Sequence, residues 1–121
     1  MNMLPTPATV ASLFALMMQR YGKTRARISN VTLKSVSRRS MLRAKFLSDV
    51  RSELEEWGYL IVPLDRGGFG LLSSASLEGA PPITAKGLIP EELAALKKND
   101  LNEDAVWAEL AAEVEEPQEE T

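Results

Sequence analysis

The strongest constraint on the fold is a change of apolar periodicity at Gly58. Before this glycine, apolar side chains recur every three or four positions along residues 40–57, which predicts one long helix. The predicted buried stripe is Leu42, Phe46, Val50, Leu54 and Trp57. Ser40 is suited to cap this helix and Gly58 to end it.

The residues after Gly58 have the pattern of a β-hairpin. Residues 59–64 and 69–72 are short apolar runs, and Asp65-Arg66-Gly67-Gly68 between them is a turn signal. Pro63 has no N–H group to donate, so it is expected at a sheet edge or at a bulge.

The N-terminal part predicts two further helices. Thr6 followed by Pro7 favours a helix start and Gly22 its end, so a helix is expected over residues 7–21. Its predicted stripe is Val10, Leu13, Phe14, Met17 and Tyr21. Residues 23–37 are ambiguous, because alternation over residues 31–34 also suits a strand. We favour a brief extended piece near residues 26–28 and a short helix over residues 30–36, capped by Asn30.

After Ser73, a linker is expected over residues 76–89, because glycine and proline interrupt any regular pattern there. An acidic helical extension is expected over residues 90–114, with one helix opening at Pro90 and another capped by Asn102. The apolar residues of this extension are Leu93, Leu96, Val106, Trp107, Leu110 and Val114. Residues 115–121 are almost wholly polar, which predicts a disordered tail.

Charge divides the chain into two parts of opposite sign. Residues 1–75 contain eleven Lys and Arg against five Asp and Glu, a balance of +6. Residues 76–121 contain three against twelve, a balance of −9. Nine of the eleven basic residues fall between Arg20 and Lys45. Such an asymmetry indicates a part that binds a polyanion, joined to an acidic part.

The order of helix, extended piece, short helix, long helix and hairpin resembles the winged helix-turn-helix superfamily of DNA-binding proteins. The resemblance covers residues 7–75 and is strongest in SMLRAKFLSDVRSELEEWGYLIVPLDRGGFGLLSS. It implies an α+β, mostly helical fold, with a DNA-binding domain over residues 1–75 and a two-stranded wing over residues 59–74. It also implies a sequence-specific transcription regulator that inserts its recognition helix, residues 40–57, into the major groove.

The charges on the long helix support the resemblance on separate physical grounds. Four cations lie at or before its predicted first turn, and three glutamates lie in its last turns. Both ends therefore oppose the helix dipole, at a cost of roughly 0.3–1 kcal/mol for each exposed charge. An anion at the N-terminal end would remove this conflict, because the cations and the dipole would both attract it.

Position and resemblance together predict nine DNA-binding residues. Base-edge contacts are predicted for Arg39, Ser40 and Arg43, since arginine can donate two bonds to guanine. Phosphate contacts are predicted for Lys34, Arg38 and Lys45. At the hairpin tip, Arg66 is expected to reach phosphate or the minor groove. Arg25 and Arg27 are expected to add contacts to the DNA backbone.

Other interpretations compete with this one. A basic run can be a solvated face that binds nothing. Winged helices also serve as protein-interaction modules, and then the acidic helices, rather than Arg39 or Arg43, would carry the function. A DNA accessory role in replication, partition or excision is also compatible. RNA binding would need exposed aromatic residues for stacking, whereas most of the seven aromatics fall on predicted core stripes.

The composition argues against an enzyme. The chain has no cysteine and no histidine, which removes thiol chemistry, the commonest general base and the commonest metal ligands. Asp100, Asn102 and Asp104 have the spacing that opens a calcium loop, but Ala105 stands where glycine is required. The glycines after Arg66 lack the Lys-Ser/Thr pair of a phosphate loop. We therefore predict no catalytic residue, no metal and no cofactor.

The apolar residues 8–18 are expected to form a core helix in a cytoplasmic protein. No positive charge precedes Arg20, as a signal peptide would require, and a bilayer crossing needs about 20 apolar residues. The acidic extension has three interpretations. It would pack on the first helix or in a homodimer, bind another protein with Trp107 as the main contact, or compete with DNA for the basic surface.

Overall fold

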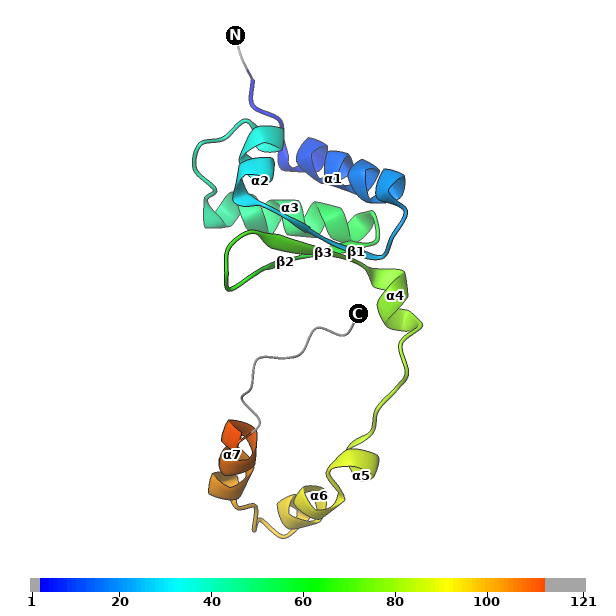
Figure 1. The fold of residues 1–121 in the computed structure, drawn as a ribbon, viewed down its shortest axis with the longest axis vertical. Coiled ribbons are helices and arrows are strands. Elements are labelled where there is room, and N and C mark those ends of the chain that lie inside the picture. Colours follow the sequence, from blue (N-terminus) through cyan, green and yellow to red (C-terminus); the bar gives the residue numbers. More distant parts are fainter. Residues whose placement is uncertain (1–2, 113–121) are drawn as a thin grey trace. The chain divides into compact units, whose positions relative to one another are not determined.

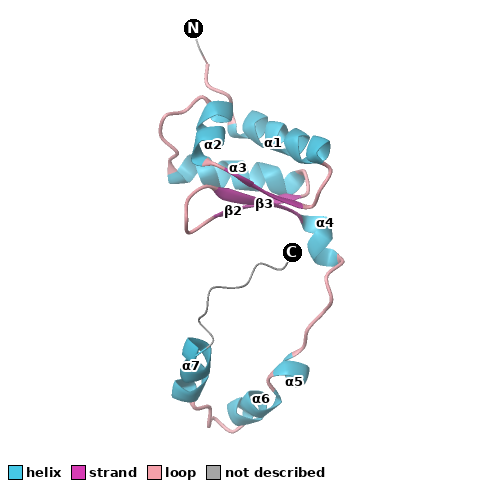
Figure 2. Ribbon diagram, viewed as in Figure 1, coloured by secondary structure: helices cyan, strands magenta, loops and turns pink. Residues whose placement is uncertain are grey.

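The computed structural model describes residues 3–112, and the chain divides into two compact units, Met1–Ala80 and Pro81–Thr121. The first unit contains α1 (Pro7–Tyr21), β1 (Arg25–Ile28), α2 (Asn30–Ser37), α3 (Ala44–Glu56), β2 (Tyr59–Pro63), β3 (Phe69–Ser73) and α4 (Ser74–Glu78) (Figure 1). The second contains α5 (Ala85–Leu88), α6 (Pro90–Lys97) and α7 (Glu103–Ala112) (Figure 2). The described chain is thus α+β and mostly helical, and the predicted order of elements in the first unit is confirmed.

The ends of α1 are set by the residues that predicted them. Thr6 Oγ1 accepts a hydrogen bond from the Thr9 N–H at 3.2 Å. Pro7 occupies the first turn, and Gly22 ends the helix in the left-handed region, with φ +77°. The predicted bounds of residues 7–21 are therefore confirmed.

The buried face of α1 differs in part from the predicted stripe. The buried side chains are Val10, Ala11, Phe14, Ala15 and Met18. Three predicted members, Leu13, Met17 and Tyr21, are 39%, 40% and 53% exposed. Both faces of α1 carry apolar residues, so periodicity alone could not decide which face packs against the other elements. The small Ala11 and Ala15 lie on the face that packs.

The long helix begins later than the sequence predicts. The cap of α2 is Ser29, whose Oγ accepts from the Thr32 N–H at 3.1 Å, and not Asn30. α2 ends at Ser37, and the C-cap residue Arg38 adopts a left-handed conformation with φ +57°. α3 then starts only at Ala44, so the prediction that Ser40 caps it is wrong.

The later start of α3 changes which residues of the predicted stripe are buried. Leu42 lies in the loop before α3, where it is partly buried against the core. Phe46, Val50 and Leu54 form the buried face of α3 as predicted. Trp57 follows the last turn and is 59% exposed, so its predicted place in the core is wrong.

The sheet is antiparallel, with strand order β1-β3-β2. The predicted hairpin is present, and the predicted extended piece becomes β1, a third strand that pairs with β3. Ser73 donates to Thr24 O at 2.7 Å, whereas Ser74 donates to Gly58 O at 2.9 Å. At the end of β3, consecutive N–H groups thus bond the residues that precede β1 and β2, in the alternation of an antiparallel ladder. Pro63 lies on the edge strand β2, as predicted.

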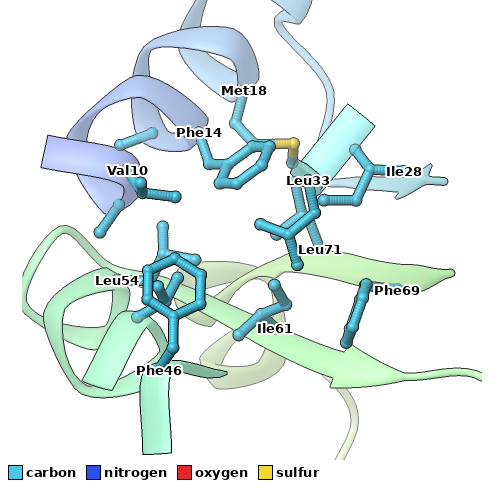
Figure 3. Close-up of a cluster of buried hydrophobic side chains, with 13 residues drawn as sticks. Val10, Phe14, Met18, Ile28, Leu33, Phe46, Leu54, Ile61, Phe69 and Leu71 are labelled. Carbon is cyan, nitrogen blue, oxygen red and sulfur yellow. The ribbon is translucent and has the colours of Figure 1, made fainter. Parts of the chain in front are cut away.

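The core fills the space between the sheet and the helices that cover one of its faces (Figure 1). Figure 3 shows side chains from α1, α2, α3 and all three strands meeting there. Phe14, Leu33 and Leu54 are fully buried. Burial of a side chain of this size contributes about 1.5–3 kcal/mol, so this cluster is the main source of stability in the first unit.

The second unit has helices but no buried residue among residues 81–112. α6 opens at Pro90 as predicted, and Asn102 Oδ1 caps α7 by accepting from the Ala105 N–H at 3.1 Å. The residues predicted to form a linker, 76–89, include the end of α4 and all of α5, and the two units divide within them after Ala80. Val114 and the predicted tail, residues 115–121, lie outside the described residues. Over residues 3–112, no helix has both the length and the apolar character needed to cross a bilayer.

Candidate nucleic-acid interface

The loop between α2 and α3 gathers four of the predicted DNA-binding residues around one open hollow. The polar residues that line it are Arg38, Arg39, Ser40 and Arg43. Leu4, Met41 and Phe46 complete the lining. The hollow lies directly before the first turn of α3, so its cations surround the N-terminal end of that helix.

Arg39 is engaged by its own chain. Its Nη1 donates to Pro5 O at 2.8 Å and to Ser37 O at 3.1 Å. Its guanidinium carbon lies 4.0 Å from the centroid of the Phe46 ring, a cation–π contact. Arg39 therefore ties the segment before α1, the end of α2 and the first turn of α3 together. A base contact by Arg39 would have to compete with these interactions.

The N-terminal end of α3 has no side-chain cap. Arg43 occupies the N-cap position without a capping hydrogen bond, and the first turn contains no acidic residue. The first N–H groups of a helix have no acceptor within the helix, and the positive end of the helix dipole lies beside them. With Arg43 exposed at this position, the end of α3 attracts anions through both its cations and its backbone.

Lys45, in the first turn, forms an ion pair with Asp49 at 3.0 Å. The Lys45 side chain is 86% exposed and that of Asp49 is 40% exposed. Exposed pairs of this type contribute little, typically below about 1 kcal/mol. A phosphate could therefore replace Asp49 as the partner of Lys45 at a small cost in stability.

The outward face of α3 contains a basic residue that the sequence reasoning missed. Ala44, Ser48, Arg51, Ser52 and Glu55 are exposed, opposite the buried Phe46, Val50 and Leu54. Most of these exposed side chains are small, which would allow close approach to another molecule, and Arg51 projects from the middle of the face. Its signal was present in the sequence, because Arg51 falls between the apolar positions of the predicted stripe.

The hairpin lies next to the same loop. A second hollow is lined by Asn30, Lys34, Ser40, Met41, Leu42, Leu47 and Phe69. It places Lys34 of α2 and the first residue of β3 around the α2–α3 loop. Arg66 lies in the exposed turn before β3, closed by a bond from the Leu64 N–H to Gly68 O at 3.0 Å. In Figure 1 this turn and the loop lie at the same end of the unit.

Arg25 and Arg27 lie on a different surface. Both are exposed on β1, alternating with the partly buried Ala26 and the buried Ile28. Since alternate residues of a strand face opposite sides, the two arginines project from the face of the sheet that does not contact the core. The structure therefore separates them from the seven other predicted residues.

The sequence that precedes α3 contains cations but no acidic residue. No carboxylate precedes Asp49 in the chain. Among the described residues there is also no group of three acidic residues placed to hold a metal ion. Comparison of this chain with protein-family models, with curated proteins and with solved structures found no match.

Proposed function

We propose that the first unit is a winged-helix domain that binds double-stranded DNA, with a role in sequence-specific regulation of transcription. The observation that carries the proposal is the uncapped N-terminus of α3, flanked by exposed Arg38 and Arg43. The order of helices and strands and the sheet order β1-β3-β2 support the same assignment. In helix-turn-helix proteins the N-terminal end of the recognition helix, the counterpart of α3 in this proposal, enters the major groove.

The proposed roles follow from exposure and position. Arg43 and Arg51 on α3 contact base edges, where an arginine can donate two bonds to guanine. Lys34, Arg38 and Lys45 contact phosphate, and Ser40 adds a neutral donor in the loop. Arg66 contacts the flanking backbone from the hairpin turn. Arg39 has a positioning role, because it holds the loop through Pro5 O and Phe46.

Fluorescence anisotropy of a labelled mixed-sequence duplex, titrated with the full chain at several salt concentrations, tests the proposal. We expect affinity to fall steeply with salt, because bound phosphates release counterions. Arg43→Ala combined with Arg51→Ala should weaken binding roughly tenfold or more. Lys34→Ala should reduce the salt slope by about 1.

A matched control removes the same charge from the other surface. Arg25→Ala combined with Arg27→Ala also deletes two exposed arginines, but from the outer face of the sheet. This variant should retain nearly all affinity. Equal losses in the two double variants would mean that net charge alone drives binding, and absence of binding at low salt by the folded protein would rule the proposal out.

A second function is favoured by one observation in the acidic unit. Leu96 is 49% exposed, and Trp107 and Leu110 are each 62% exposed. Such residues are suited to contact another protein, with Trp107 as the largest contact. If DNA does not bind, a protein-interaction module acting through α6 and α7 becomes the leading proposal.

A further inference from the structure

An apolar groove lies in the first unit, between the C-terminal half of α1 and β1. Its apolar lining is Met17, Met18, Tyr21, Ala26, Ile28 and Leu71, and Arg27 is the one charged residue of the described chain that borders it. We refer to it as the β1 groove. Met17 and Tyr21 are the exposed residues that were wrongly predicted to be core. Their exposure beside the sheet leaves apolar surface on α1 that no other described element of this unit covers.

The strand that borders this groove has a free edge. β1 is the outer strand of the sheet, and no strand within residues 3–112 pairs with its other side. Thr24 O accepts from the Ser73 N–H, so the ladder continues through Ala26 and Ile28 toward β3. By the alternation of an antiparallel pair, the backbone N–H and C=O groups of Arg25 and Arg27 point to the free edge. These groups are suited to bind an added strand.

The positive charges around the free edge of β1 indicate which kind of segment it would bind. Arg20, Lys23, Arg25 and Arg27 are exposed on and between α1 and β1, and these segments contain no carboxylate. Lys23 Nζ lies 5.7 Å from the centroid of the Tyr21 ring, close to the groove. Pairing of β1 with β1 of a second copy would set arginines opposite arginines, which is unfavourable. An acidic partner is favoured by the same charges.

We propose that the β1 groove binds an extended segment of another protein in which acidic and apolar residues alternate. The segment adds to the free edge of β1 as a fourth strand. Because strand side chains alternate between faces, its acidic residues lie beside Arg25 and Arg27 on the outer face. Its apolar residues enter the groove against Met17, Tyr21 and Ala26. The proposal is separate from DNA binding, which uses α3.

The test measures binding of a short fluorescent peptide, in which Glu alternates with Val and Leu, to the full chain. A scrambled peptide of the same composition and a peptide N-methylated on the strand-pairing amides serve as ligand controls. We expect both to bind at least about tenfold more weakly, because one lacks the alternation and the other lacks the edge hydrogen bonds. Equal binding of all three would reduce the interaction to charge attraction and overturn the proposal.

Protein variants locate the site. Arg25→Glu with Arg27→Glu, and separately Met17→Asp, should each weaken peptide binding about tenfold or more. Arg43→Glu should leave peptide binding unchanged while it abolishes DNA binding, so the two proposals can fail independently. Self-association that the peptide disrupts would assign the edge to a second copy instead. Peptide binding that appears only after deletion of residues 113–121 would assign it to the chain's own acidic end.

Discussion

The two units contain similar apolar residues but bury them very differently. In the first unit, Phe14, Leu33 and Leu54 are fully buried where helices and sheet meet. In residues 81–112 no residue is buried, and Trp107 is 62% exposed. Isolated helices shorter than about 12–15 residues are marginal in water, and within the described residues 81–112 no helix of the second unit spans more than ten. An apolar stripe becomes core only where another element faces it.

The first and largest test of this comparison removes a large side chain from each unit. Phe14→Ala should lower the free energy of unfolding by about 3–5 kcal/mol, because it leaves a cavity in the core. Leu110→Ala should change it by no more than about 0.5 kcal/mol, because its side chain is mostly exposed to solvent. Urea unfolding followed by circular dichroism measures both. Similar losses would contradict the difference between the units.

A smaller effect is expected where the backbone of the first unit packs most closely. Gly68 has φ +77°, and a Cβ there would lie 2.6 Å from Ile28 O. Gly68→Ala should therefore cost about 1–3 kcal/mol in thermal unfolding measurements. Gly67 also has a positive φ, +98°, but its Cβ would meet open space. Gly67→Ala is the control, and an equal loss there would show that conformation, and not the close approach, sets the cost.

Removal of a helix cap should lower the free energy of unfolding more in the first unit than in the second. Thr6 caps α1 and Asn102 caps α7, each through one side-chain oxygen. Thr6→Ala should lower the free energy of unfolding by about 1 kcal/mol. Asn102→Ala should leave global unfolding unchanged and reduce only the helicity of α7, observed by NMR chemical shifts. A shift of the global transition by Asn102→Ala would mean that α7 belongs to the same cooperative unit as the core.

The smallest effect is expected from deletion of residues 81–121. Since the buried hydrophobic residues found in the structure all lie in the first unit, its free energy of unfolding should change by no more than about 0.5 kcal/mol. Chemical unfolding of the shortened and full chains gives the comparison. A loss of several kcal/mol would show that the second unit stabilises the first through packing.

Local signals predicted the elements whose ends they define. Thr6 and Gly22 gave the bounds of α1, and Asn102 gave the start of α7. The Asp65-Arg66-Gly67-Gly68 turn gave the hairpin. Each of these signals acts within a few residues, so the rest of the fold was not needed to interpret it.

The candidate site could be predicted only in outline. The sequence located the cations between α2 and α3, but it did not show that Arg39 donates to Pro5 O, 34 positions away. It also did not separate Arg25 and Arg27, which lie on the outer face of the sheet. Arg51 lies in the middle of the exposed face of α3, away from the cations before the helix on which the prediction was based. For Arg39, Arg25 and Arg27, the deciding contacts join residues far apart in the chain.

The sequence by itself determined the caps of α1 and α7, the hairpin turn, the charge division and the order of elements in the first unit. Tertiary structure decided where α3 begins, which face of α1 is buried, that β1 joins the sheet and which arginines share a surface. The physical reason is range. Capping bonds and turn conformations depend on neighbouring residues, whereas burial and side-chain pairing depend on elements brought together only when the chain folds.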